Sequence, residues 1–242
     1  MYTTLPQNNN ININPIKAFK DNYIWLIEES RNGIIVDPGD ATPVLKELKK
    51  RNINLVSILI THKHFDHTGG IEELINNYPT VQIYGPKNTA FEFKYTIVKE
   101  GDLVSIPETN VKFYVIETPG HTLDHIVFVD KYHLFSGDTL FACGCGKLFE
   151  GSHQDMFESL SKISSLTPNT KVYCAHEYTK ENIKFALSID ADNYKLKERY
   201  KRLQNIEITI PSLLKEELET NPFLRAKTSE EFKLIRKRKD EF

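Results

Sequence analysis

The chain has 242 residues, 40% hydrophobic and 26% charged, a composition that predicts a globular protein with a sizeable core and excludes a disordered chain. Its formal net charge of −2 gives no overall electrostatic reason to bind nucleic acid or an anionic membrane. No segment approaches the roughly 20 apolar residues that cross a bilayer, and the N-terminus has no cationic start followed by an apolar core. We therefore expect a cytoplasmic protein without a nucleic-acid or membrane partner.

The chain begins with strand patterns that alternate with helix patterns. IIVDPG at residues 34–39 is an apolar strand broken by proline and glycine, and ATPVLKELKKRN after it has apolar residues at helical spacing. LVSILI at residues 55–60 is a continuous apolar run typical of a buried strand. GIEELINNY at residues 70–78 then returns to helical periodicity.

Further strands interrupt the rest of the first three quarters of the chain. VKFYVI, HIVFV, HLFS and KVYCA read as strands, and SLSKISSL reads as part of an amphipathic helix. Some strands are close enough to pair as hairpins, which favours mixed sheets with helices outside over a doubly wound parallel sheet. From about residue 180 the segments are charged and helical in period. We expect one domain over residues 1–178 and a small helical domain over residues 179–242.

THKHFDHTGG, residues 61–70, follows a predicted buried strand and carries four possible metal ligands. Neutral imidazoles and a carboxylate are donors that zinc, iron and manganese accept. Donors this close in sequence point in different directions, which suits two adjacent ions better than one. We therefore pair His62 with His64, and Asp66 with His67.

A two-metal site needs further donors from distant segments, ideally with a carboxylate that bridges both ions. Three predicted strands end in a turn that bears such a donor: His121 in PGHT, Asp138 in SGDT and His176 in CAHE. The repetition of this arrangement predicts that the strand ends converge on one face. It also disfavours the plainer interpretation, a polar loop whose histidines are incidental.

The remaining histidines and the cysteines receive no catalytic role. A lone histidine is more often a surface or hydrogen-bonded core residue than a ligand, as we expect of His133 and His153, whereas His125 is expected to support the ligands or to be structural. Cysteine spacing here is not the C-x-x-C of a redox or zinc pair. We expect the thiols of Cys143, Cys145 and Cys174 to be reduced, and these small residues to be buried or to lie in loops.

Together these motifs resemble the metallo-β-lactamase superfamily. The later motifs GDTLFACGCGKLFEG (137–151), HEYT (176–179) and NPFLR (221–225), with a basic final helix, are similar to the hydroxyacylglutathione hydrolase, or glyoxalase II, family. The resemblance runs from DNY at residues 21–23 to the last residues. It implies an α+β fold, an αββα sandwich with two mixed β-sheets, followed by a helical substrate domain that binds glutathione.

The resemblance also implies a site with two divalent metal ions, zinc first and iron or manganese as alternatives. Asp138 would bridge the ions, and Asp66 would orient a metal-bound hydroxide that attacks the substrate. The substrate would be a small glutathione thioester, chiefly S-D-lactoylglutathione, hydrolysed to D-lactate and glutathione in methylglyoxal detoxification. The implied ligands are His62, His64 and His121 for one metal, and Asp66, His67 and His176 for the other.

For glutathione itself the resemblance implies four contacts, and the residues alone support them only in part. Thr228 and Glu231 have capping-box spacing for a final helix, but cations near its C-terminus are favoured by the helix dipole with or without a ligand. Phe149 stands where many relatives have a tyrosine, so it lacks the hydroxyl that would form one substrate hydrogen bond. The matching positions are Lys147, Tyr178, Arg236 and Lys239.

Several alternatives stay open at this stage. The nearest are a lactonase, a general thioesterase or a persulfide dioxygenase with one iron, all in the same superfamily. A nuclease is disfavoured by the near-neutral charge. A relative that has lost catalysis is disfavoured by the complete set of seven predicted ligands. We expect the protein to be a monomer. We also expect hydrolysis without a covalent enzyme intermediate, because the thiolate leaving group departs readily.

Overall fold

The computed structural model describes residues 5–88 and 91–242. By its internal contacts the chain divides into two compact units. We call residues 5–117 and 124–131 the N-terminal unit, and residues 118–123 and 132–242 the C-terminal unit. The domain boundary predicted after residue 178 is a different division, and it stays a prediction.

The N-terminal unit is built on a six-stranded mixed sheet. Its strands lie in sequence order, with the first three antiparallel and the later ones parallel. The runs predicted at 34–39 and 55–60 are its third and fourth strands, and they are buried as expected. The strands are β1 (Asn12–Ala18), β2 (Asn22–Glu29), β3 (Asn32–Val36), β4 (Asn54–Leu59), β5 (Gln82–Gly85) and β6 (Thr96–Ile97).

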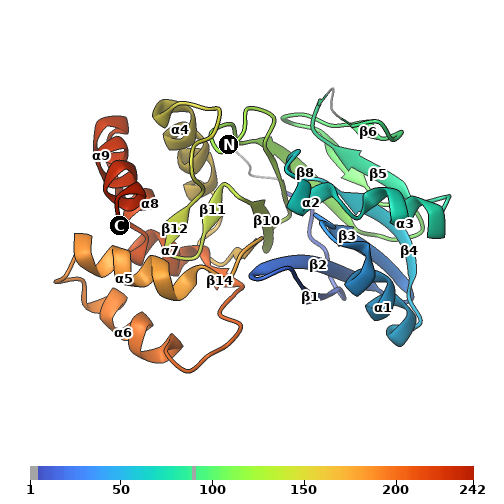
Figure 1. The fold of residues 1–242 in the computed structure, drawn as a ribbon, viewed down its shortest axis with the longest axis horizontal. Helices are drawn as coiled ribbons and strands as arrows, with labels where there is room; N and C mark the ends of the chain where they lie inside the picture. Colours follow the sequence, from blue (N-terminus) through green and yellow to red (C-terminus); the bar gives the residue numbers. More distant parts are fainter. Residues whose placement is uncertain (1–4, 89–90) are drawn as a thin grey trace. The chain divides into compact units, whose positions relative to one another are not determined.

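Two helices cover one face of this sheet (Figure 1). Val44 and Leu48 of the first helix pack in one cluster with Leu74 of the other and with Ile35 and Ile58 of the sheet. Burying each of these side chains stabilises the fold by about 2 kcal/mol. The helices are α1 (Ala41–Arg51), which Asp40 caps through the Thr42 amide, and α3 (Ile71–Asn77); a single turn, α2 (Phe65–Thr68), precedes α3.

A second group of strands in the N-terminal unit is antiparallel. It comprises β7 (Leu103–Ser105), β8 (Lys112–Glu117) and β9 (Ile126–Val129). Two hydrogen bonds join it to the first sheet: Asn32 Nδ2 donates to the Glu108 carbonyl at 2.6 Å, and the Asn110 amide donates to Glu29 at 2.9 Å.

The C-terminal unit contains a small mixed sheet and a hairpin. Strand β10 (His133–Gly137) pairs in parallel with β13 (Lys171–Cys174), which pairs antiparallel with β14 (Ser212–Leu213). The hairpin joins β11 (Leu140–Phe141) to β12 (Gly144–Cys145). Helix α4 (His153–Ser164) begins at a capping box made by Ser152 and Asp155.

Helices make up most of the chain after residue 178, as the sequence predicted. They are α5 (Thr179–Ile189), α6 (Tyr194–Leu203), α7 (Leu214–Thr220), α8 (Pro222–Arg225) and α9 (Ser229–Asp240). Thr228 caps α9 by accepting the Glu231 amide at 3.1 Å, at the predicted start. The region is not purely helical, because β14 lies within it and adds an edge to β13.

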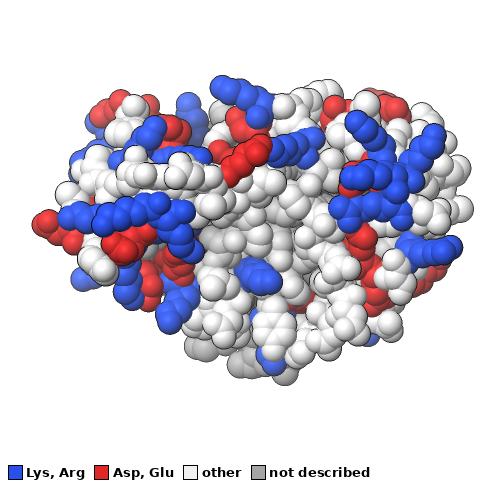
Figure 2. Space-filling view, turned by 90° about the horizontal axis from the view of Figure 1, so that it is seen from below, with Lys and Arg blue, Asp and Glu red and all other residues white. Residues whose placement is uncertain are grey.

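The described part of the chain contains no helix that is long and apolar enough to span a membrane. On the face drawn in Figure 2, lysine and arginine side chains are interspersed with aspartate and glutamate, in keeping with the formal net charge of −2.

Candidate active site

The metal-binding motif of the N-terminal unit lies at the carboxyl end of β4. The sequence predicted one loop, but Asp66 and His67 lie on the short helix α2 and only His62 and His64 precede it. Nε2 of His62 lies 3.1 Å from Nδ1 of His64, and Nε2 of His67 lies 3.6 Å from the Asp66 carboxylate. The motif therefore gathers four donors on one strand end and one helical turn.

The buried residue Asp37 orients this motif through hydrogen bonds, and it was not predicted from the sequence. Its carboxylate accepts the Thr61 amide and hydroxyl, each at 2.8 Å, and lies 3.0 Å from Nδ1 of His67. With the Nδ1 hydrogen engaged by a carboxylate, Nε2 of His67 is the nitrogen left to bind a metal. Asp37 ends an apolar strand just as Asp138 does, so the strand-end pattern could have found it.

Two further contacts support the motif of the N-terminal unit. Asn22, at the start of β2, donates its amide hydrogen to Asp66 Oδ2 at 2.8 Å. The buried ring of His125 stacks on His62 with a centroid distance of 4.8 Å, because the amide of Ile126 bonds to the Thr61 carbonyl. His125 therefore supports a predicted ligand, as expected.

The C-terminal unit brings together the other three predicted ligands. Asp138 follows β10 and His176 follows β13, and these strands are parallel neighbours whose carboxyl ends share one edge. One oxygen of Asp138 lies 3.4 Å from His121 Nε2, and the other lies 3.5 Å from His176 Nε2. The two carboxylate oxygens thus face two different imidazoles. All three side chains are buried.

The loop after β12 wraps around His121. The Lys147 carbonyl lies 2.7 Å from Nδ1 of His121, and the Phe149 amide donates to the His121 carbonyl at 3.1 Å. This engages Nδ1 and leaves Nε2 of His121 directed at Asp138. The close approach requires Gly146, because a Cβ there would lie 1.9 Å from the Asp138 carbonyl oxygen.

The side chains predicted to contact substrate in this region are exposed. Lys147 Nζ lies 5.8 Å from the centroid of the Phe149 ring, which meets the His121 ring edge-on. Tyr178 stacks on His176 at 4.7 Å with nearly parallel rings. A cation and two aromatic rings therefore lie directly beside predicted metal ligands.

Arg236 and Lys239, predicted to bind the glycine carboxylate of glutathione, lie on α9 in different environments. Arg236 is buried and donates to the Cys145 carbonyl at 3.1 Å and to Asp240 at 2.8 Å. Lys239 Nζ lies over the rings of Phe185 and Phe242, at 5.0 and 5.3 Å. Burial, with the charge of Arg236, lowers the pKa of Lys239.

The three cysteines are free and buried. Burial raises the pKa of Cys143 and Cys174 to about 12 and that of Cys145 to about 11. Such thiols are protonated at neutral pH and make poor nucleophiles. We therefore keep the expectation that they take no part in catalysis.

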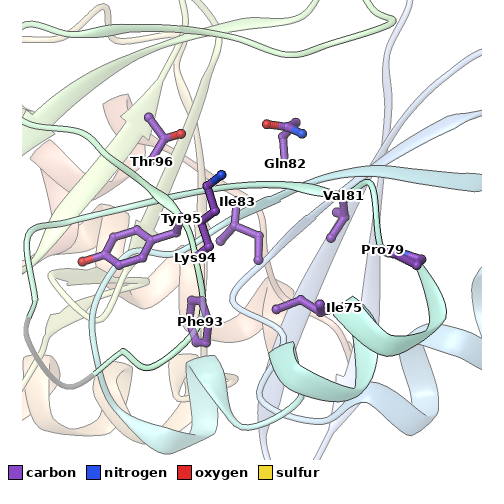
Figure 3. Close-up of a pocket in the computed structure, with 9 residues that line it drawn as sticks. All are labelled: Ile75, Pro79, Val81, Gln82, Ile83, Phe93, Lys94, Tyr95 and Thr96. Carbon is purple, nitrogen blue, oxygen red and sulfur yellow. The ribbon is translucent and has the colours of Figure 1, made fainter.

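A cavity of about 420 Å³ lies at the edge of the N-terminal sheet (Figure 3). Its walls include Ile75 of α3, Ile83 of β5 and Phe93, with Gln82 and Lys94 among the polar lining residues. The lining includes no histidine, cysteine or carboxylate and none of the predicted site residues. We assign it no part in catalysis.

Comparison with known proteins gives the family. A model described as the metallo-β-lactamase superfamily matches residues 19–176, and one described as the hydroxyacylglutathione hydrolase C-terminus matches residues 177–242. The chain belongs to the hydroxyacylglutathione hydrolase family. It is 47% identical to the hydroxyacylglutathione hydrolase of Nitrosomonas europaea, covering 89% of this chain and 83% of that one. It is 48% identical to that of Photobacterium profundum, covering 89% and 86%.

The fold agrees with this membership. A crystal structure of a metallo-β-lactamase from Staphylococcus aureus matches with a TM-score of 0.69 at 21% identity, covering 95% of this chain and 67% of the other. The predicted family and the α+β fold with mixed sheets and a helical C-terminal region are therefore confirmed. Among its described residues the chain has groups of histidine and aspartate side chains that could hold a metal ion.

Proposed function

We propose that this chain hydrolyses glutathione thioesters, converting S-D-lactoylglutathione and related 2-hydroxyacyl glutathiones to the 2-hydroxy acid and glutathione. The observation that carries this conclusion is that both family models match, one over the metal motifs and one over the helical region. Relatives that bear the name hydroxyacylglutathione hydrolase are 44% to 48% identical over 89% of the chain.

We further propose that the seven predicted ligands hold two divalent metal ions. The donor chemistry of each unit fits this, because ring nitrogens of His62 and His64 lie 3.1 Å apart and the two oxygens of Asp138 face different histidines. Asp138 is therefore suited to bridge. Zinc is expected, and iron or manganese would be accepted by the same donors. We propose that one ion is held by His62, His64 and His121, and the other by Asp66, His67 and His176.

The chain's own residues then position the reactants. The chemistry that bound metal ions would supply here is polarisation of the thioester carbonyl and a lowering of the pKa of water from about 15.7 toward neutrality. Asp66, held by Asn22, orients the attacking water toward the thioester carbon. The departing glutathione thiolate has a conjugate pKa of about 8.5, so its expulsion needs little help from an acid. The cysteine thiols are buried and protonated, so we propose that they take no part in the reaction.

Glutathione would lie against the exposed side chains beside the C-terminal ligands. Lys147 offers a cation and Tyr178 a hydroxyl and a ring face next to His176. Phe149 cannot donate the hydrogen bond of the tyrosine found in many relatives, but its ring meets His121. For the glycine carboxylate we propose Arg236 and Lys239. Asp240 already accepts a hydrogen bond from Arg236, so a bound carboxylate would compete with it there.

We also propose that the enzyme works as a monomer in the cytoplasm on a small-molecule substrate. Three buried free thiols suit a reducing compartment. Light scattering of the purified protein would check the oligomeric state.

The test is metal analysis joined to a substrate screen. Metal should be measured per chain, removed with a chelator and restored with zinc, iron or manganese. We expect two ions per chain, and hydrolysis of S-D-lactoylglutathione that is lost on chelation and regained on restoration. Unchanged turnover by the metal-free protein would refute the mechanism. Preference for simple lactones, or sulfur oxidation with one iron per chain, would favour the alternative activities instead.

A further inference from the structure

Arg199 of α6 and Glu217 of α7 form an ion pair inside the C-terminal unit. Arg199 Nη2 donates to Glu217 Oε1 at 2.5 Å, and the two side chains are 1% and 0% exposed. Arg199 Nη1 also donates to the Thr220 hydroxyl at 2.7 Å. Burial alone lowers the pKa of Arg199, but the Glu217 carboxylate more than offsets this and raises it. A buried pair is weak evidence for stability, since desolvation offsets the attraction between the charges.

The second oxygen of Glu217 indicates a more specific role. Oε2 accepts the backbone amide of Cys143 at 2.7 Å, from the two-residue turn of the β11–β12 hairpin. Cys143 has a positive φ of 59°, a conformation that is costly for a residue with a side chain. Arg199 pairs with one oxygen of this carboxylate while the Cys143 amide donates to the other, so Glu217 links α6 to the hairpin turn.

Other buried amides hold the same hairpin. Asn221 Nδ2 donates to the carbonyls of Phe141 and Gly144, at 3.2 and 3.0 Å. Asn182 Nδ2 of α5 donates to the Ala142 carbonyl at 3.1 Å. In Figure 1 the hairpin lies among helices α5, α7 and α8. Its backbone is thus fixed by side chains from the helical region.

The hairpin connects two parts of the candidate site. It begins two residues after Asp138 and ends two residues before Lys147. The Lys147 carbonyl then contacts Nδ1 of His121 at 2.7 Å. A change in the hairpin backbone would therefore move both the exposed lysine and the imidazole that its carbonyl orients.

We propose that the Arg199–Glu217 pair is a positioning device that holds the β11–β12 hairpin, and through it Lys147 and His121, in the geometry that binds substrate. The identity of the ligand rests on the proposed function, but the hairpin contacts do not. If the pair only joined α6 to α7, the hydrogen bond that the Cys143 amide donates to Glu217 would be dispensable.

Two double variants test the Glu217 Oε2 acceptor, which receives the Cys143 amide at 2.7 Å and Asn221 Nδ2 at 3.3 Å. Arg199→Met with Glu217→Gln removes both charges but keeps an acceptor for the Cys143 amide. Arg199→Met with Glu217→Leu removes the charges and the acceptor together. Neither leaves a buried charge without its counterion, so both should fold. Lys195→Ala is the surface control, because it breaks only the exposed 2.5 Å pair between Lys195 of α6 and Glu219 of α7.

The measurements are melting temperature, amide hydrogen exchange over residues 140–149, and KM and kcat for S-D-lactoylglutathione. We expect the Leu variant to exchange faster over the hairpin than the Gln variant and to show a KM about tenfold higher, the size expected for one buried hydrogen bond, with kcat less affected. The Gln variant and Lys195→Ala should stay close to the parent in hairpin exchange.

Equal exchange in the Gln and Leu variants would overturn the proposal, and so would faster exchange with unchanged KM. A general loss of protection across the whole unit would assign the pair to overall stability and also overturn it. If the parent protein does not hydrolyse the thioester, the proposed function fails. Exchange, together with the affinity for glutathione measured by titration, then decides the positioning role separately.

Discussion

The carboxylate of Asp37 holds the imidazole of His67, with 3.0 Å between Oδ2 and Nδ1, while it also accepts two hydrogen bonds from Thr61. Asp37 is 4% exposed and His67 is fully buried, so this contact is shielded from water. It sets which ring nitrogen faces outward and how far the ring can rotate. A predicted metal ligand thus depends on a residue 30 positions earlier in the chain.

Asp37→Ala should therefore weaken metal binding without removing a ligand. Loss of such an orienting partner typically lowers metal affinity about 10- to 100-fold. Competition with a chromophoric chelator would measure this. Asp40→Ala is the matched control, because it removes a nearby carboxylate that only caps α1. That control should cost about 1 kcal/mol of stability and leave metal affinity unchanged. Equal affinity in the parent and Asp37→Ala would contradict the orienting role.

Asp138→Ala should reduce both metal content and turnover. Its two oxygens lie 3.4 and 3.5 Å from different histidines, so its removal takes a donor from each proposed metal set. We expect fewer than two ions per chain by elemental analysis and a loss of activity of at least about 100-fold. A variant that still binds two ions tightly would show that Asp138 is not a bridge.

Arg236→Ala and Lys239→Ala should behave differently although the residues are three apart on α9. Arg236 is buried against the Cys145 carbonyl, so its truncation should cost roughly 2 kcal/mol of stability as well as raise KM. Lys239 is half-buried and lies over the rings of Phe185 and Phe242, so its truncation should raise KM with a small change in melting temperature. Kinetics and thermal melting on both variants would decide, and an unaltered KM in both would remove the pair from the substrate site.

The lowered pKa of Lys239 predicts a pH dependence. Binding of a carboxylate needs the protonated ammonium, whose pKa lies below the ordinary 10.5 because burial disfavours the charge. As pH rises toward that lowered pKa, KM should increase earlier than an ordinary lysine would allow. Lys239→Arg should shift this rise to higher pH, because arginine stays protonated. Identical alkaline limbs for the parent and Lys239→Arg would exclude Lys239 as the titrating group.

The three cysteine thiols should not react with thiol reagents in the native protein. With pKa values of about 11 to 12 and buried side chains, all three cysteines should react with Ellman's reagent at pH 8 only after unfolding. The expected count is zero before and three after addition of guanidinium. Rapid reaction of a native thiol would show that its part of the C-terminal unit opens readily.

Several secondary-structure elements of this protein could be predicted from local sequence patterns. Apolar periodicity predicted β3, β4, α1 and α3. The capping-box spacing of Thr228 and Glu231 predicted where α9 begins. The strand-end pattern predicted that the turns bearing His121, Asp138 and His176 converge, and the parallel pairing of β10 with β13 brings the carboxyl ends of two of these strands to one edge. Their role as metal ligands stays a prediction.

Other elements escaped the sequence analysis for physical reasons. Strand β1 carries Pro15, which an edge strand tolerates but which obscures a strand pattern, so the β1–β2 pair was missed. Strand β14 is two residues long and depends on pairing with β13. The one-turn helix α2 is too short to leave a periodic signal.

The sequence by itself determined which donors this chain carries, which strands end in them and to which family it belongs, because those properties reside in short local motifs. Only the tertiary structure decided what holds the donors in place. Glu217 reaches the Cys143 amide across 74 positions, and Asn22 reaches Asp66 across 44. Such partners are chosen by packing, since a buried hydrogen bond needs two groups at about 2.8 Å and no local pattern encodes that distance between remote segments.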